Sequence, residues 1–164
     1  MSRTLVLLRH GKSGYPPGVD DHGRPLADRG RREAALAGRW MTDEGLHVDA
    51  VVCSTATRTR ETLDATGITA PTAYADDIYG GTPFEILEAV RLHAPADAAT
   101  VLVVGHAPGM PDTALTLDPD GSIDRFPTSA YAVLTIGVPW DRVGLDTDPD
   151  TKLIGVRIPR DDAD

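Results

Sequence analysis

Short apolar runs alternate along this chain with longer segments whose apolar residues recur every three or four positions. The runs at residues 4–8, 48–54 and 100–104 are rich in Leu, Val and Ala, which is typical of strands buried on both faces. Helical patterns follow at residues 28–44, 55–66 and 82–93. The alternation predicts an α/β fold, a three-layer sandwich whose mostly parallel central sheet is flanked by helices.

The expected helices carry recognisable end signals. Asp28 can cap the first helix and Gly45 can end it, while Gly67 can end the second. In the third helix, Thr82 is the expected cap and Pro83 the first residue. The residues expected to face the core are Ala34, Leu36 or Ala37, Trp40 and Met41 in the first helix, and Phe84, Leu87, Val90 and the stem of Arg91 in the third.

Two late apolar runs, at residues 130–138 and 152–159, have no helix between them. We therefore expect an antiparallel pair of strands at one edge of the sheet near the C-terminus. The sequence shows no internal repeat and no long linker, which predicts a single domain over residues 1–164. The acidic stretch 160–164 is expected to be a frayed end. Trp140 is expected to pack against the edge strand, with a partner contact as the alternative.

Charge and cysteine content narrow the possible partners. The formal net charge of −9 argues against a nucleic-acid partner, which requires a basic face. A local arginine cluster can still bind a small anion. No apolar run approaches the length of a membrane span, and the one cysteine, Cys53, excludes an internal disulfide. We expect a cytoplasmic monomer with no membrane partner.

Polar side chains follow three of the predicted strands. Arg9 and His10 end the first, Arg58 lies shortly after the second, and His106 ends the third. Ligands of open α/β sheets lie beyond the carboxyl ends of strands. If these strands are parallel neighbours, two imidazoles and two guanidinium groups surround one oxyanion, and arginine suits phosphate. One neutral histidine could then attack phosphorus.

Each of these residues also has a structural interpretation. A single loop histidine or helix arginine usually lies in solvent, and we place His22, His47 and His93 in that class. Cys53 follows two valines and is expected to be a small buried group rather than a nucleophile. The functional hypothesis depends on the combination of residues.

Three motifs resemble those of the histidine phosphatase, or phosphoglycerate-mutase-like, superfamily. "LLRHGKS" is similar to its RHG signature, "CSTATRTRET" to its Ser-x-x-x-Arg-x-x-x-Thr motif, and "VLVVGHAPG" to its strand ending in Gly-His. The second motif aligns Ser54, Arg58 and Thr62. The resemblance implies that His10 is a transiently phosphorylated nucleophile, that Arg9, Arg58 and His106 form the phosphate pocket, and that neither a metal nor another cofactor is used.

The short chain, "RHGKS" and "DDHGRPLADRG" resemble the SixA-type phosphohistidine phosphatases in particular. Lys12 and Ser13 are then candidate substrate-binding residues, although Lys12 could equally be a surface lysine. The segment after the second motif is too short for the insertion that supplies a glutamate acid in larger relatives. Asp77 and Glu85 are weak candidates for such an acid, and a solvated turn is the preferred interpretation of Asp76 and Asp77.

Imidazole can leave a phosphoryl group without a proton, because its conjugate acid has a pKa of about 6.5, whereas an alkoxide needs one. We therefore expect a metal-independent phosphatase whose partner is a phosphorylated protein carrying phosphohistidine. One alternative is a phosphomonoesterase acting on a small phosphorylated substrate, with Asp77 or Glu85 as acid. The other alternative is a phosphate-binding interaction module without turnover.

Overall fold

The computed structural model describes residues 2–160 and contains a six-stranded sheet in the order β3-β2-β4-β1-β5-β6. The strands are β1 (Arg3–Arg9), β2 (Ala50–Ser54), β3 (Thr72–Ala75), β4 (Thr100–Gly105), β5 (Tyr131–Ile136) and β6 (Lys152–Arg157). The first four strands run parallel, and β5 and β6 join the sheet as antiparallel strands. The predicted fold class and its antiparallel C-terminal edge are therefore confirmed.

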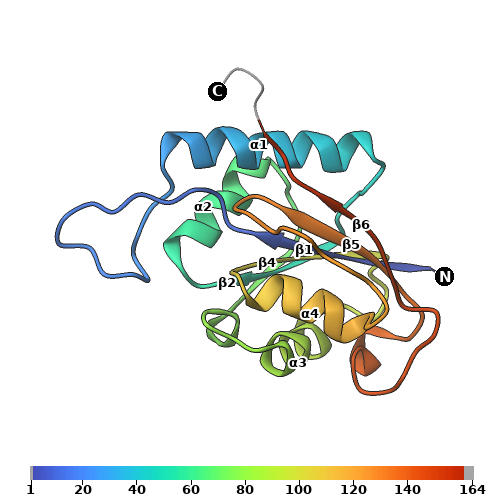
Figure 1. Cartoon of the computed structure of the whole chain (residues 1–164). Coiled ribbons are helices and arrows are strands. Elements are labelled where there is room, and N and C mark those ends of the chain that lie inside the picture. Colours follow the sequence, from blue (N-terminus) through green and yellow to red (C-terminus); the bar gives the residue numbers. More distant parts are fainter. Residues whose placement is uncertain (1, 161–164) are drawn as a thin grey trace.

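Helices cover both faces of the sheet (Figure 1). The α-helices are α1 (Asp28–Asp43), α2 (Thr57–Thr66), α3 (Pro83–His93) and α4 (Gly109–Leu117), and two short 3₁₀ helices are η1 (Asp76–Ile78) and η2 (Trp140–Arg142). Helices α1 and α2 pack on one face, where Met41 and Leu63 meet Val6 and Leu8. Helices α3 and α4 pack on the other face, over Leu5 and Leu7 of β1.

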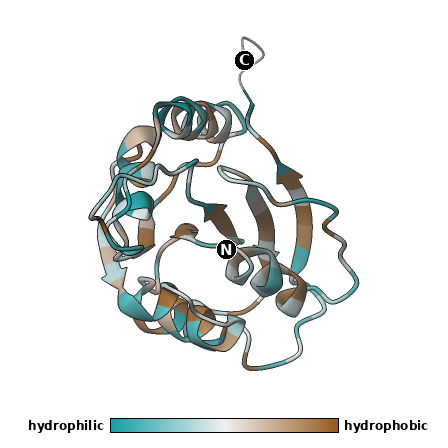
Figure 2. Cartoon of the chain, turned by 60° about the vertical axis from the view of Figure 1, so that its left-hand side comes forward, coloured by the Kyte–Doolittle hydropathy of each residue, from teal (hydrophilic) through white to brown (hydrophobic). Residues whose placement is uncertain are grey.

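The buried strands explain the strength of the hydrophobic pattern. Residues Leu5 to Leu8 are fully buried, because β1 lies between β4 and β5 and is covered on both faces. Figure 2 shows the inner strands of the sheet mostly in the hydrophobic colour, enclosed by helices that mix both colours, as amphipathic helices do. Within the part of the chain that the structure describes, no helix is long and apolar enough to cross a membrane.

Several local expectations need correction. Helix α2 begins at Thr57, two residues later than predicted, and α1 has Ala27 rather than Asp28 at its N-cap. Leu36 and Trp40 are only half-buried, so Ala37 completes the stripe of α1. Phe84 is 70% exposed because it lies on the outer side of the first turn of α3.

Trp140 is buried, and its indole N–H donates to the Ala98 carbonyl, which confirms packing as its role. The sequence pattern gave no indication of β3 or α4. Residues 161–164 of the acidic tail lie outside the described residues.

Candidate active site

Strands β1 and β4 bring two distant histidines together. The strands are parallel neighbours, and Arg9 pairs in register with Gly105, so the next residues, His10 and His106, leave the sheet at the same point. Their ring centroids are 5.3 Å apart, with the ring planes tilted by 58°. One oxyanion of phosphate size can therefore contact both rings, as the sequence hypothesis requires.

His10 is held in a defined protonation state. Its Nδ1 lies 2.7 Å from the carbonyl oxygen of Gly11. Since a carbonyl only accepts, Nδ1 carries the proton and Nε2 keeps its lone pair. His10 is 7% exposed. Its pKa is lowered to about 4, chiefly by burial and also by the charges of Arg58 and Arg9, although the bond to Gly11 acts in the opposite direction. His10 is thus a neutral imidazole at neutral pH.

His106 is oriented by the end of the neighbouring strand β2. Its Nε2 lies 2.8 Å from the Ser54 hydroxyl oxygen, and Ser54 is the first residue of the second sequence motif. Burial, together with the nearby His10 and Arg58, lowers the pKa of His106 to about 3. Two neutral imidazoles therefore lie side by side among cations, an arrangement that an anion would stabilise.

Two arginines add positive charge beside this pair. Arg58 lies in the first turn of α2, is 6% exposed, and donates from Nη1 to the backbone carbonyl of Asp21 at 2.6 Å. Arg9, at the end of β1, is half-buried and donates to the Phe126 carbonyl at 3.0 Å. Both guanidinium groups lower the pKa of His10, so their charges act at its imidazole ring.

The loop that carries His10 is locked by Thr62, the last residue of the second motif. The Thr62 hydroxyl accepts a hydrogen bond from the Gly11 N–H at 2.9 Å and donates to the Arg58 carbonyl at 2.6 Å. Gly30 of α1 packs directly on the same loop, since a Cβ there would lie 2.1 Å from the Lys12 carbonyl oxygen. A helix hydroxyl and a glycine contact therefore fix the loop's position.

A second group of residues at the site was missed by the sequence reasoning. Asp21 lies on the connection between β1 and α1, and its carboxylate accepts hydrogen bonds from Tyr79 and Arg24 and an ion pair from Arg58. The Tyr79 hydrogen bond, followed by those of Arg24 and Arg58, holds the pKa of Asp21 well below its usual range. Asp21 and Arg24 both belong to the quoted segment "DDHGRPLADRG", which was the available signal. Tyr79 stands in no motif.

Tyr79 extends the histidine pair into a row of aromatic rings. Its ring lies edge to face with the rings of His106 and His22, at distances between ring centroids of 5.4 Å and 4.9 Å. His22 is half-buried and hydrogen-bonds Thr55 at 2.9 Å, so its assignment to the solvent-exposed class was wrong.

The remaining candidate residues of the sequence differ in their exposure and in their hydrogen bonds. Lys12 is exposed, and Ser13 is buried with its hydroxyl accepting from Arg24 at 2.6 Å. The carboxylate of Glu85 caps its own helix, accepting from the backbone N–H of Thr82 at 3.2 Å. Glu85 is therefore engaged at the start of its own helix. Asp77 is exposed on η1.

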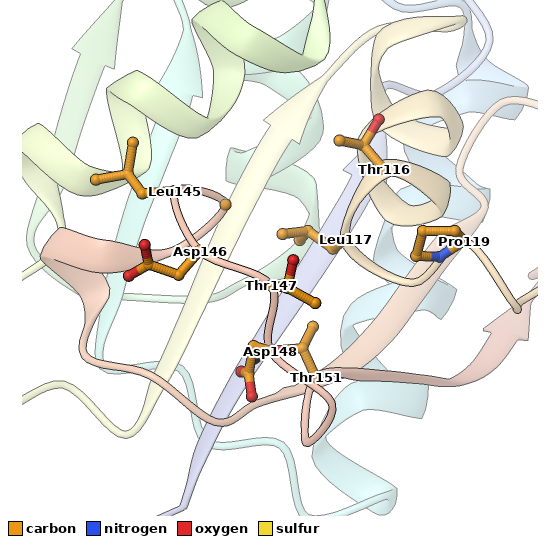
Figure 3. Close-up of a pocket in the computed structure, with 9 residues that line it drawn as sticks. Thr116, Leu117, Pro119, Leu145, Asp146, Thr147, Asp148 and Thr151 are labelled. Atoms are coloured by element: carbon orange, nitrogen blue, oxygen red, sulfur yellow. Dashed lines mark hydrogen bonds between the residues drawn. The ribbon is translucent and has the colours of Figure 1, made fainter.

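Two hollows differ in their relation to the site. One of about 190 Å³ opens beside His106 and is walled by the loop before α3 and the start of α4. The other, of about 270 Å³, lies at the far end of α4 between Leu117 and the 144–151 loop (Figure 3). There the Asp148 carboxylate accepts from the Gly137 N–H and the Thr151 hydroxyl, so it organises its own loop. Among the described residues, no group of three or more His, Cys, Asp or Glu could hold a metal ion.

Comparisons with known proteins agree with this geometry. Residues 5–76 match the family described as histidine phosphatase superfamily (branch 1). A structure of a candidate phosphohistidine phosphatase SixA from Nakamurella multipartitia is 42% identical, covers 97% of both chains, and superposes with a TM-score of 0.87. The chain belongs to the histidine phosphatase superfamily.

Within that superfamily this phosphatase belongs to the SixA-type branch, and it is a hydrolase. A second candidate phosphohistidine phosphatase SixA, from Agrobacterium tumefaciens, is 27% identical over 96% of this chain and 99% of its own, with a TM-score of 0.76. The uncharacterized protein Rv1276c of Mycobacterium tuberculosis is 43% identical over 93% of this chain and its own full length. The similarity to these proteins thus extends well beyond the three motifs.

Proposed function

We propose that this phosphatase hydrolyses phosphohistidine displayed on another protein, and that His10 carries the phosphoryl group between the two steps. In the first step, Nε2 of His10 forms a bond to phosphorus while the bond from phosphorus to the substrate imidazole breaks. In the second step, water attacks phosphorus and returns His10 with inorganic phosphate. Arg9, Arg58 and His106 are proposed to bind the phosphoryl oxygens in both steps.

The observation that carries the proposal is the state of His10. A nucleophilic imidazole needs an unprotonated nitrogen, and the Gly11 carbonyl holds the proton on Nδ1. Burial keeps the pKa of His10 near 4, so the lone pair is available at neutral pH. Phosphoryl transfer depends mainly on positioning and charge stabilisation, and fixed arginines beside two neutral histidines are suited to both.

The choice of phosphohistidine rests on the carboxylates of the site. An alkyl phosphate requires a proton on its leaving oxygen. Asp21 contacts the site's cations, but its depressed pKa keeps it ionised. Glu85 is engaged at the start of α3. Imidazole leaves as a neutral group without such help when its second ring nitrogen already carries a proton, because the pKa of its conjugate acid is about 6.5.

The test compares phosphohistidine on a carrier protein with a simple alkyl phosphate, using kcat/KM for each. We expect clear preference for phosphohistidine, little change in that preference in the double variant Asp77→Asn, Glu85→Gln, and loss of both activities in His10→Gln. Equal or better turnover of the alkyl phosphate, abolished in the double variant, would establish the phosphomonoesterase instead. Phosphate binding without turnover of either substrate would identify a binding module.

A further inference from the structure

Asp21 is a charged group at the site to which the two proposed chemical steps assign no part. It lies on the connection between β1 and α1 that reaches out beside α2 in Figure 1. Its side chain is 57% exposed, yet Tyr79, Arg24 and Arg58 all bind its carboxylate. Three partners from three segments, the β1–α1 connection, α2 and the turn after η1, therefore hold a carboxylate at the rim of the phosphate site. Retaining a negative charge next to a phosphate pocket opposes anion binding, so this placement needs an explanation.

The direction of the reaction sends the leaving group toward the solvent side of the site, where this carboxylate lies. Attacking and leaving atoms lie roughly in line through phosphorus. His10 is buried at the floor of the site, whereas Asp21 and Tyr79 lie at its solvent side. The leaving group consequently departs toward the rim. Tyr79 connects the two regions, since its ring contacts His106 and its hydroxyl donates to Asp21.

We infer that Asp21 is a specificity-determining residue that faces the leaving group, favouring protonated imidazole and disfavouring groups that leave as oxyanions. This inference rests on the proposed function. A carboxylate attracts the ring N–H of a phosphoimidazolium and repels the negative charge that grows on the oxygen of a phosphate ester. The charge of Asp21 therefore favours departure of the imidazole and opposes departure of the oxyanion.

The electron count is consistent with this role. In phosphohistidine protonated on its second ring nitrogen, the electron pair of the breaking P–N bond stays on the ring nitrogen. The ring's positive charge is neutralised by that pair, and imidazole leaves neutral with its other N–H intact. Asp21 accepts a hydrogen bond from that N–H without receiving the proton. In an aryl phosphate, the pair of the breaking P–O bond leaves as a phenolate.

The test measures kcat/KM of wild type and Asp21→Asn for phosphohistidine and for p-nitrophenyl phosphate. Asparagine keeps the size and an acceptor oxygen while removing the charge. Because a hydrogen bond to a charged group contributes about 1.5–3 kcal/mol, we expect the ratio of phosphohistidine to aryl phosphate turnover to fall at least about tenfold. Asp20→Asn is the matched control, with the same charge change in the adjacent residue and an oxygen that can still accept from Gly23. It should leave the ratio unchanged.

The ratio separates specificity from structural damage. Loss of the Arg58 or Arg24 contacts would lower both activities together and leave the ratio constant, as would partial misfolding. A constant ratio in Asp21→Asn and Asp21→Ala, in a wild type that does hydrolyse phosphohistidine, overturns this inference and leaves the proposed function standing. A wild type without phosphohistidine turnover overturns both.

Discussion

Replacing Thr62 by valine should separate the effect of fixing the loop that carries His10 from the effect of ordinary core packing. The Thr62 hydroxyl accepts from the buried Gly11 N–H at 2.9 Å and donates to the Arg58 carbonyl. Valine has nearly the same shape, so the change removes the oxygen and leaves the Gly11 N–H without its acceptor. An unsatisfied buried donor costs about 1–3 kcal/mol. We expect the free energy of unfolding to fall by about 2 kcal/mol, or Tm by roughly 4–8 °C for a chain of this size.

Thr113 provides a matched control. It is 0% exposed, as Thr62 is, and its hydroxyl has no hydrogen-bond partner in the part of the chain that the structure describes. Thr113→Val removes an unsatisfied hydroxyl from the core, so stability should be unchanged or rise by up to about 1 kcal/mol. Urea unfolding gives both values, and turnover should fall only in Thr62→Val. Equal stability changes in the two variants, or full turnover in Thr62→Val, would refute the assigned role of the hydroxyl.

Two further predictions concern packing and pH. Gly30→Ala should lower the free energy of unfolding by about 1–3 kcal/mol and reduce turnover, because its Cβ would lie 2.1 Å from the Lys12 carbonyl oxygen. Gly155→Ala should change neither, because a Cβ there would meet no atom within 4 Å apart from the glycine and its chain neighbours. Equal effects of the two changes in urea unfolding and activity assays would contradict this. The pKa values of His10 and His106, about 4 and about 3, lie below the unfolded value of about 6.5, so the folded state binds fewer protons and stability should fall as the pH drops from about 6.5 toward 4. Urea unfolding at several pH values should show that fall, smaller in His106→Gln; equal falls in both proteins would contradict the assignment.

The central part of the site, the pair His10 and His106, could be predicted from the sequence because the order and direction of the strands determine its position. Leu5 to Leu8 and the run at 100–104 are continuous apolar stretches, and parallel pairing of two such strands places the residues after them side by side. The positions of His10 and His106 therefore followed from pattern and topology together. Arg58 was expected from its place just after the second predicted strand, whereas Thr62 was indicated only by the resemblance of "CSTATRTRET" to the family's second motif. Their four-residue spacing places both on one face of α2.

What the sequence did not indicate depends on contacts between segments without periodicity. Asp21 and Tyr79 come from two irregular connections and meet only because both fold over the start of α2. Strand β3 has four residues, of which Tyr74 is exposed, so its apolar signal is weak. Phe84 is predicted to be a core residue because it is a phenylalanine. It lies in the first turn of α3, however, on the side that faces solvent. Such placements are decided by tertiary packing rather than by local pattern.

The measurement that tests the account most directly is detection of the phosphorylated enzyme. Wild type and His10→Gln are mixed with phosphoramidate, quenched in base, digested, and analysed by mass spectrometry for a phosphoryl group that is lost in acid. The account predicts this modification on His10 in the wild type and neither modification nor turnover in the variant. A phosphoryl group on another residue, or turnover that persists in His10→Gln, would contradict it.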